Sequence, residues 1–221
     1  MFVLTIDQIG SRSSTDRIPE LLTLLRPVPT VLPWERSVGD EAQGVLAGAP
    51  DVVQAVLLCL RAGGWYVGIG VGEVDTPLPA SPREGRGSAF VHARTAVDRA
   101  KKTGERAPLA VEGPDGAAEA EGVLALLGRH VLARSEAEWR ILDLLEPGVR
   151  GTQTAVARTL GITPQAVSKA AARAAWHEEQ AVRPAAARLL AWVDRDAGTP
   201  GRPTPVPRRS SAVAVIVGAV R

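Results

Sequence analysis

Residues 151–176, GTQTAVARTLGITPQAVSKAAARAAW, contain two short stretches of helical apolar spacing separated by a tight turn. Thr152 is a candidate N-cap for the first stretch. Gly161 stands at the turn, where a residue with positive φ is usually needed. Thr163 and Pro164 suit the cap and the first position of the second helix. The pattern therefore predicts a helix-turn-helix.

The second predicted helix would bury Val167 and expose small or hydrogen-bonding side chains. Such side chains can reach base edges and phosphates in a major groove. The candidate DNA-binding residues are Thr152, Thr163, Gln165, Ser168, Lys169 and Arg173. Duplex DNA is the expected partner, and a homodimer is expected because paired recognition helices match paired half-sites. The alternative is a small helical hairpin that makes protein contacts.

The charge distribution agrees with a nucleic-acid partner for the second half of the chain. Residues 1–134 carry 14 basic and 16 acidic groups, and residues 135–196 carry 8 of each. The tail from Ala197 adds four arginines and no acid. A basic tail beside a DNA-binding unit favours phosphate contacts. A solvated end of the chain explains the same composition equally well.

Cysteine and histidine usage excludes several kinds of site. Cys59 is the single cysteine, so an internal disulfide and a multi-cysteine zinc site are both excluded. The three histidines have no ligand spacing. No signal peptide is recognisable, and the apolar run 212–220 is too short to span a bilayer as a helix. We expect a cytoplasmic protein without a membrane span.

The order of the expected elements indicates two domains and a tail. Domain 1–130 would be an α+β sandwich with its helices on one face of the sheet. Its expected strands are 2–9, 31–38, 44–46 and 65–74, and its expected helices are 17–25, 50–62 and 88–102. A further helical segment, 117–132, is expected to link the two domains. Domain 131–196 would be all-α, with or without a wing, and its expected helices are 136–145, 152–160, 164–176 and 184–193. Residues 197–221 form a basic, proline-rich tail whose apolar end could add a last strand.

Two carboxylates of the first domain stand at informative places. Asp7 is near the end of the first expected strand, and Asp40 is at the tip of the expected hairpin. If these strands are neighbours, both side chains can share a hard cation such as Mg²⁺ that holds phosphates. By spacing alone, ordinary roles in a turn and at a hairpin tip explain the two residues better.

Four motifs occur in the order found in class III nucleotide cyclases: TIDQIGSR, VGDEAQG, VGIGVGEV and GSAFVHARTAVDRAKK. The first resembles the cyclase metal strand, and the second resembles the cyclase hairpin that carries a Gly-Asp pair. The third and fourth resemble a later strand and the helix that follows it. As a whole, the chain resembles the SatD family, in which a helix-turn-helix follows a similar domain. The segment TPQAVSKA also resembles recognition helices of bacterial transcription regulators.

The resemblance implies a ferredoxin-like, palm-type domain that binds a nucleoside triphosphate (ATP or GTP) with Mg²⁺. Asp7 and Asp40 would be the metal ligands. The implied nucleotide-binding residues are Ile9, Gly10 and Ser11 at the triphosphate, Arg36 at the base and Arg94 at a phosphate. Phe90 stands four positions before Arg94, where the family has Asn, so a hydrogen-bond donor to the transition state is missing.

These observations favour a bacterial transcription regulator whose first domain senses a purine nucleoside triphosphate with Mg²⁺ as ligand rather than substrate. The alternative is an enzyme: an active nucleotide cyclase or nucleotidyltransferase fused to a DNA-binding unit. A degenerate sensor that serves only as a dimerisation platform is a third possibility. Phe90 disfavours the enzyme, and the presence of Asp7 and Asp40 disfavours the degenerate sensor.

Overall fold

A computed structural model describes residues 1–197, which contain one five-stranded mixed sheet. Its strands are β1 (Phe2–Gln8), β2 (Leu32–Arg36), β3 (Glu41–Leu46), β4 (Trp65–Val71) and β5 (Leu109–Glu112). They lie in the order β2-β3-β1-β4-β5. The first four strands pair antiparallel, whereas β5 pairs parallel to β4. The α+β class is confirmed, and β5 is a strand that the sequence pattern did not predict.

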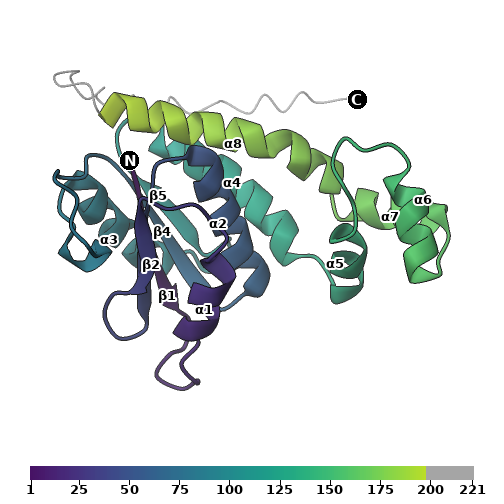
Figure 1. The fold of residues 1–221 in the computed structure, drawn as a ribbon, viewed down its shortest axis with the longest axis horizontal. Coiled ribbons are helices and arrows are strands. Elements are labelled where there is room, and N and C mark those ends of the chain that lie inside the picture. Colours follow the sequence, from purple (N-terminus) through teal and green to yellow (C-terminus); the bar gives the residue numbers. More distant parts are fainter. Residues whose placement is uncertain (198–221) are drawn as a thin grey trace, which may run out of the picture.

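The helices surround the sheet and extend well beyond it (Figure 1). They are α1 (Ile18–Leu25), α2 (Ala49–Ala62), α3 (Ser88–Ala100), α4 (Ala117–Leu132), α5 (Glu136–Leu142), α6 (Thr152–Leu160), α7 (Pro164–Arg173) and α8 (Trp176–Ala197). Helices α1, α2, α4 and α8 share the large apolar core with one face of the sheet. Helix α3 covers the other face. The expectation that all helices lie on one face is therefore wrong.

The sheet has a bulky face and a small-residue face because side chains alternate along each strand. Phe2, Leu4 and Ile6 of β1 point into the large core, where they are fully buried. On the opposite face, Gly68 and Gly70 of β4 lie against α3. A Cβ atom built on Gly70 would come within 2.1 Å of the carbonyl oxygen of Ala89. The two glycines thus allow the backbone of α3 to rest directly on the sheet.

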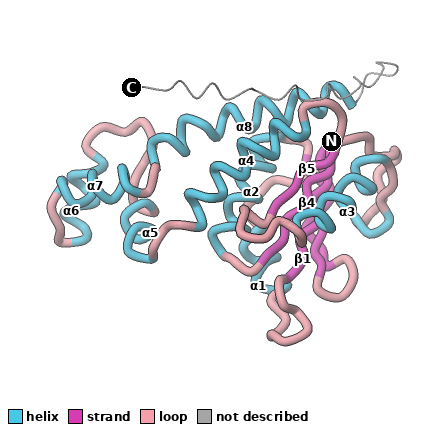
Figure 2. Tube along the Cα trace, turned by 180° about the vertical axis from the view of Figure 1, so that it is seen from behind, coloured by secondary structure: helices cyan, strands magenta, loops and turns pink. Residues whose placement is uncertain are grey.

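Helices α5, α6 and α7 form a three-helix unit with its own apolar core, built around Leu142, Val156, Val167 and Trp176. Figure 2 shows this unit projecting away from the sheet, with α8 returning from it across α2 and α4. The expected helix 184–193 is only part of α8, which includes Pro184 in its interior. Within residues 1–197 no strand follows α7, so the three-helix unit has no wing there.

Some expectations fall outside the described structure. The apolar run 212–220 and the arginine-rich tail both lie beyond residue 197. Among the helices of residues 1–197, none combines the length and the apolar character that crossing a membrane requires.

The contact between β4 and α3 predicts the effect of one added methyl group. We expect Gly70→Ala to lower the free energy of unfolding by about 3 kcal/mol, because helix backbone rather than a flexible side chain fills the space. Gly122→Ala is the matched control, since Gly122 lies within α4 with nothing near its Cβ position. This control should raise stability by about 0.5–1 kcal/mol. Urea unfolding of both variants measures the difference, and equal stabilities would contradict the proposed contact.

Candidate functional site

A shallow hollow of about 680 Å³ lies where β1 ends, next to the β2–β3 hairpin. Its lining residues are Asp7, Gln8, Gly10, Ser11, Arg12, Gly39, Asp40, Glu41, Tyr66 and Lys101. The antiparallel register of β1 and β3 places Asp7 opposite Glu41. The backbone N–H of Gln8 donates to the carbonyl of Asp40 at 3.1 Å. The sheet therefore brings together four predicted site residues: Asp7, Gly10, Ser11 and Asp40.

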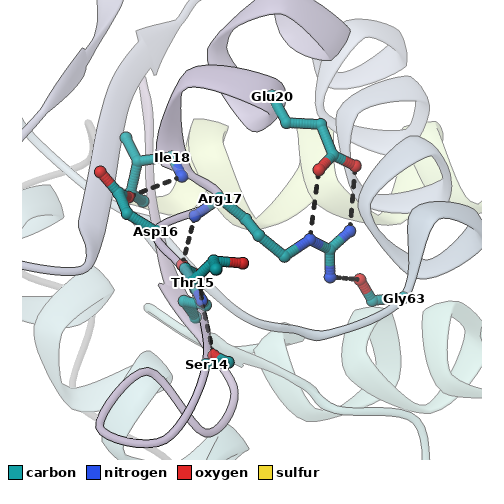
Figure 3. A network of polar contacts seen from close by, with 8 residues as sticks. Ser14, Thr15, Asp16, Arg17, Ile18, Glu20 and Gly63 are labelled. Carbon is teal, nitrogen blue, oxygen red and sulfur yellow. Dashed lines mark hydrogen bonds and ion pairs between the residues drawn. The ribbon is translucent and has the colours of Figure 1, made fainter.

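The loop after β1 is held in place by the side chain of Gln8. Its amide donates to the hydroxyl of Ser14 at 3.0 Å and to the carbonyl of Thr15 at 2.7 Å. Its carbonyl accepts from the N–H of Arg17 at 2.8 Å. The Arg17 guanidinium in turn donates to the carbonyl of Gly63 at 3.2 Å (Figure 3). The loop is thus tied both to itself and to the turn that precedes β4.

Backbone donors in this loop remain available to a ligand. Gly10 has a φ of +69°, which glycine adopts without strain. Within residues 1–197, the N–H groups of Gly10, Ser11 and Arg12 donate to no protein acceptor. Successive free N–H groups in a turn form a concave site for anions. Ile9 differs, because its N–H is bound to the carbonyl of Gly64 at 2.9 Å and it does not line the hollow.

The charge of Asp40 is stabilised locally. The hydroxyl of Ser11 donates to its carboxylate and lowers the pKa of Asp40 below the usual value, while partial burial acts in the opposite direction. The positive charges of Lys101 and Arg12 lower this pKa further. Asp40 is therefore ionised at neutral pH, as a ligand for a cation must be.

Asp7, the other predicted metal ligand, forms an ion pair with a lysine. The ammonium group of Lys101, just after α3, lies 2.7 Å from the carboxylate of Asp7, which is only 9% exposed. Lys101 was not among the predicted site residues, although it belongs to the Lys-Lys pair that ends the fourth motif. Arg12, Glu41 and Tyr66 are further lining residues that were not predicted.

The two predicted arginines take different positions. Arg94 on α3 donates from Nη1 to both carboxylate oxygens of Glu41, at 2.6 and 2.8 Å, so it reaches the edge of the hollow. Arg36 at the end of β2 pairs with Asp16 and donates to the carbonyl of Gly39 at 2.6 Å. Arg36 does not line the hollow.

The oxygen ligands of the hollow suit a metal ion that arrives with a phosphate. Among the described residues, no three His, Cys, Asp or Glu side chains gather into a metal-binding group. Three carboxylates, Asp7, Asp40 and Glu41, line the hollow together with free backbone N–H groups, and Glu41 is paired with Arg94. Mg²⁺ is usually held by one or two carboxylates, with substrate phosphates and water completing the octahedron. The donor set therefore fits Mg²⁺ bound together with a phosphate ligand.

A second candidate surface is the exposed face of α7. The hydroxyl of Thr163 caps the helix by accepting from the N–H of Ala166 at 3.1 Å, as predicted. Gln165, Ser168 and Lys169 are all exposed, and the apolar residue between them, Val167, is fully buried. The helix therefore presents polar side chains to solvent along one side.

Two predicted residues of the three-helix unit have structural partners. Thr152 is the first residue of α6 rather than its cap, because Gly151 precedes the helix with a φ of +81°. The Thr152 hydroxyl instead accepts from the N–H of Glu146 at 3.2 Å. Arg173 donates to the carboxylate of Glu138 at 2.7 Å and so ties the end of α7 to the first turn of α5.

Comparison of the chain with protein-family models, with curated proteins and with solved structures finds no match.

The Glu138 contacts predict an acid-sensitive three-helix unit. Hydrogen bonds from Arg173 and then Ser135 lower the pKa of Glu138 from 4.5 to about 2. A carboxyl whose pKa is lower in the folded state stabilises the fold above its unfolded pKa, and this stabilisation is lost as pH falls from about 4.5 to 2. Glu138→Gln should therefore flatten the stability–pH curve in this window.

Chemical unfolding at pH 7, 4.5 and 3 measures this effect. Glu136→Gln is the control, because Glu136 is exposed in the same helical turn. If the Glu138→Gln protein lost as much stability as the parent on acidification, the folded-state ion pair would be contradicted.

Proposed function

We propose that this protein is a bacterial transcription regulator that binds duplex DNA through a helix-turn-helix formed by α6 and α7. The observation that carries this proposal is the capped helix α7, with Gln165, Ser168 and Lys169 exposed beside the buried Val167. A recognition helix needs exposed hydrogen-bonding side chains near its N-terminus, where base edges are reached. Arg173, at the other end of α7, binds Glu138 through Nε alone, and its side chain is 64% exposed.

The position of the three-helix unit supports access to a large partner. The unit projects from the rest of the molecule, so α7 is not covered by the sheet domain (Figure 1). We propose that the protein is cytoplasmic and acts as a homodimer, because two recognition helices are needed to read half-sites one DNA turn apart.

We further propose that the hollow at the end of β1 binds a purine nucleoside triphosphate with Mg²⁺. The element order β1-α1-β2-β3-α2-β4 is that of a split βαβ, ferredoxin-like unit, which supports the resemblance to class III cyclases. Asp7 and Asp40 would hold the ion, and the free N–H groups of the loop from Gly10 would receive phosphate oxygens. Bound Mg²⁺ would neutralise phosphate charge and orient the triphosphate.

Besides Arg12, which lines the hollow, Lys101 and Arg94 are two cations whose present partners are lining carboxylates. Lys101 now neutralises Asp7, and Arg94 now neutralises Glu41. An anionic triphosphate offers both side chains an alternative partner, since charge-assisted contacts to phosphate are among the strongest polar contacts. The ligand and these ion pairs would therefore compete for the same charges.

A short series of contacts links the hollow to the three-helix unit. The loop after β1 bonds to the turn between α2 and β4 through Ile9 to Gly64 and Arg17 to Gly63. Two residues earlier, Arg61 of α2 makes a bidentate ion pair with Asp143, just after α5, at 2.6 and 2.7 Å. In this proposal, nucleotide changes DNA affinity by favouring one arrangement of these contacts.

The first prediction of this proposal concerns DNA. Replacing Gln165, Ser168 and Lys169 together by Ala should abolish specific binding, because a bidentate base contact alone contributes about 1–3 kcal/mol. If Lys169 contacts a phosphate, Lys169→Ala alone should reduce the slope of the logarithm of the binding constant against the logarithm of salt concentration by about one. Electrophoretic mobility shift with duplexes selected from a random-sequence pool provides the measurement.

Lys102→Ala is the matched control for Lys169→Ala, since Lys102 is an exposed lysine just after α3. It should bind the selected duplexes as the parent does. A triple-alanine protein that remains folded by circular dichroism and binds as tightly as the parent would remove α7 from the interface.

The second prediction concerns nucleotide. Calorimetric titration should detect ATP or GTP binding with Mg²⁺, and Asp40→Asn should weaken it at least about tenfold because an ion ligand loses its charge. EDTA should have the same effect on the parent. Asp115→Asn, on an exposed loop outside the hollow, should change nothing.

Equal affinity of the parent and Asp40→Asn would rule out this metal site. Tight nucleotide binding that leaves DNA affinity unchanged would keep the site but end the sensor mechanism, because a ligand that favours neither state shifts nothing.

The third prediction separates a sensor from an enzyme. Phe90 of α3 packs against the backbone of Gly85 and an apolar cluster, so this position offers no hydrogen-bond donor to a transition state. We therefore expect no cyclic nucleotide from ATP or GTP. Chromatography after prolonged incubation is the measurement. Multiple turnovers that are lost in Asp7→Ala would establish the enzyme alternative instead.

A further inference from the structure

A second cavity, of about 460 Å³, lies between α2, α5 and α8, away from the hollow at the end of β1. Its lining residues are Pro50, Val53, Gln54, Leu57, Leu58, Arg61, Val131, Trp139, Arg183, Pro184 and Ala187. The volume is within the range of small-molecule sites, about 300–1,000 Å³. The cavity is the place where the sheet domain, the three-helix unit and the long helix α8 all meet.

The walls of this cavity are apolar and well supported. Val53, Leu57 and Ala187 are buried members of the large core that also line the cavity. Trp139 of α5 is a further wall, and two guanidinium groups hold its ring. The Arg61 guanidinium carbon lies 4.2 Å from the ring centroid, and that of Arg134 lies 4.8 Å from it. An aromatic wall fixed in this way can pack against an apolar ligand without first being ordered.

The charges around the cavity do not balance. Glu179 pairs with two arginines: with Arg134 at 2.5 Å and with Arg183 through its other oxygen, where Arg183 Nε donates at 2.7 Å. The remaining arginine of the lining, Arg61, is neutralised by Asp143. Within residues 1–197, this group of five charged side chains therefore has one positive charge in excess.

The rim also has hydrogen-bond donors to spare. Arg183 uses Nε and Nη2 on Glu179, and among the described contacts its Nη1 has no acceptor. Arg61 uses Nη1 and Nη2 on Asp143, and its Nε is likewise unused within residues 1–197. Arg61 and Arg183 both line the cavity, so these unused donors belong to residues of its border.

We propose that this cavity binds a small amphipathic organic acid with a single negative charge. The apolar part lies against Leu57, Trp139 and Ala187, and the carboxylate accepts hydrogen bonds from Arg183. One carboxylate cancels the one excess charge, whereas a phosphate monoester would reverse it. The fork of the guanidinium group also matches carboxylate geometry.

Such a ligand touches the sheet domain through α2 and the three-helix unit through α5 at the same time. It would therefore bias the arrangement of the two parts if it fitted one arrangement better. The site depends on its own walls and charges, and it stands whether or not the proposed DNA and nucleotide functions do.

The test uses the full chain and 1-anilinonaphthalene-8-sulfonate, an aromatic monoanion whose fluorescence rises in apolar sites. Decanoate should displace the probe at a concentration at least tenfold lower than decan-1-ol, because only the acid forms the charge-assisted contact. Arg183→Met should remove this tenfold preference. Arg188→Met, an exposed arginine on the same helix outside the lining, should keep it.

Ala187→Phe supplies an independent check, because the larger ring would occupy the cavity and should abolish displaceable probe binding. If this variant does not fold by circular dichroism, the comparison of Arg183→Met with Arg188→Met decides. The proposal is overturned by a parent in which decanoate displaces no probe. It is equally overturned if decanoate and decan-1-ol compete alike, or if the two arginine variants behave identically.

Discussion

The orientation of the three-helix unit depends on a buried ion pair between Arg134 and Glu179, whose side chains are 2% and 1% exposed. Arg134 lies just after α4, and Glu179 is in the first turn of α8. The Arg134 guanidinium also donates to the carbonyl of Ala174, between α7 and α8, at 3.1 and 2.7 Å. Removing one partner would leave a buried charge uncompensated, at a cost of about 3–5 kcal/mol. Arg134 thus holds together the two segments that join the three-helix unit to the rest of the molecule, one after α4 and one between α7 and α8.

Local sequence signals predicted the elements that begin or end at a glycine, a proline or a capping residue. Gly161, Thr163 and Pro164 place the start of α7 correctly because a turn glycine, a cap and an N1 proline each act over a few residues. Strand β5 was missed because its four residues are too few for a visible alternation. The start of α8 was misplaced because Pro184 fits the first turn of a helix, whereas here the helix continues through it.

Pairing between distant residues could not be predicted in the same way. The proximity of Asp7 and Asp40 could be predicted because it requires only that the hairpin pair with the first strand, which places Asp7 opposite Glu41. The ion pairs Lys101–Asp7 and Arg61–Asp143 depend instead on the packing of whole helices. The residue types of the site were therefore visible in the sequence, but the cation that meets each carboxylate was not.

Helix α8 joins the three-helix unit to the sheet domain as one continuous element of 22 residues. At 1.5 Å per residue it is about 33 Å long, so a small rotation at one end becomes a large displacement at the other. A tilt of about 5° at the end beside the sheet would move the other end by about 3 Å, close to the rise of one base pair in duplex DNA. A rearrangement too small to disturb the packing of the core is therefore enough to change the register of a distant surface.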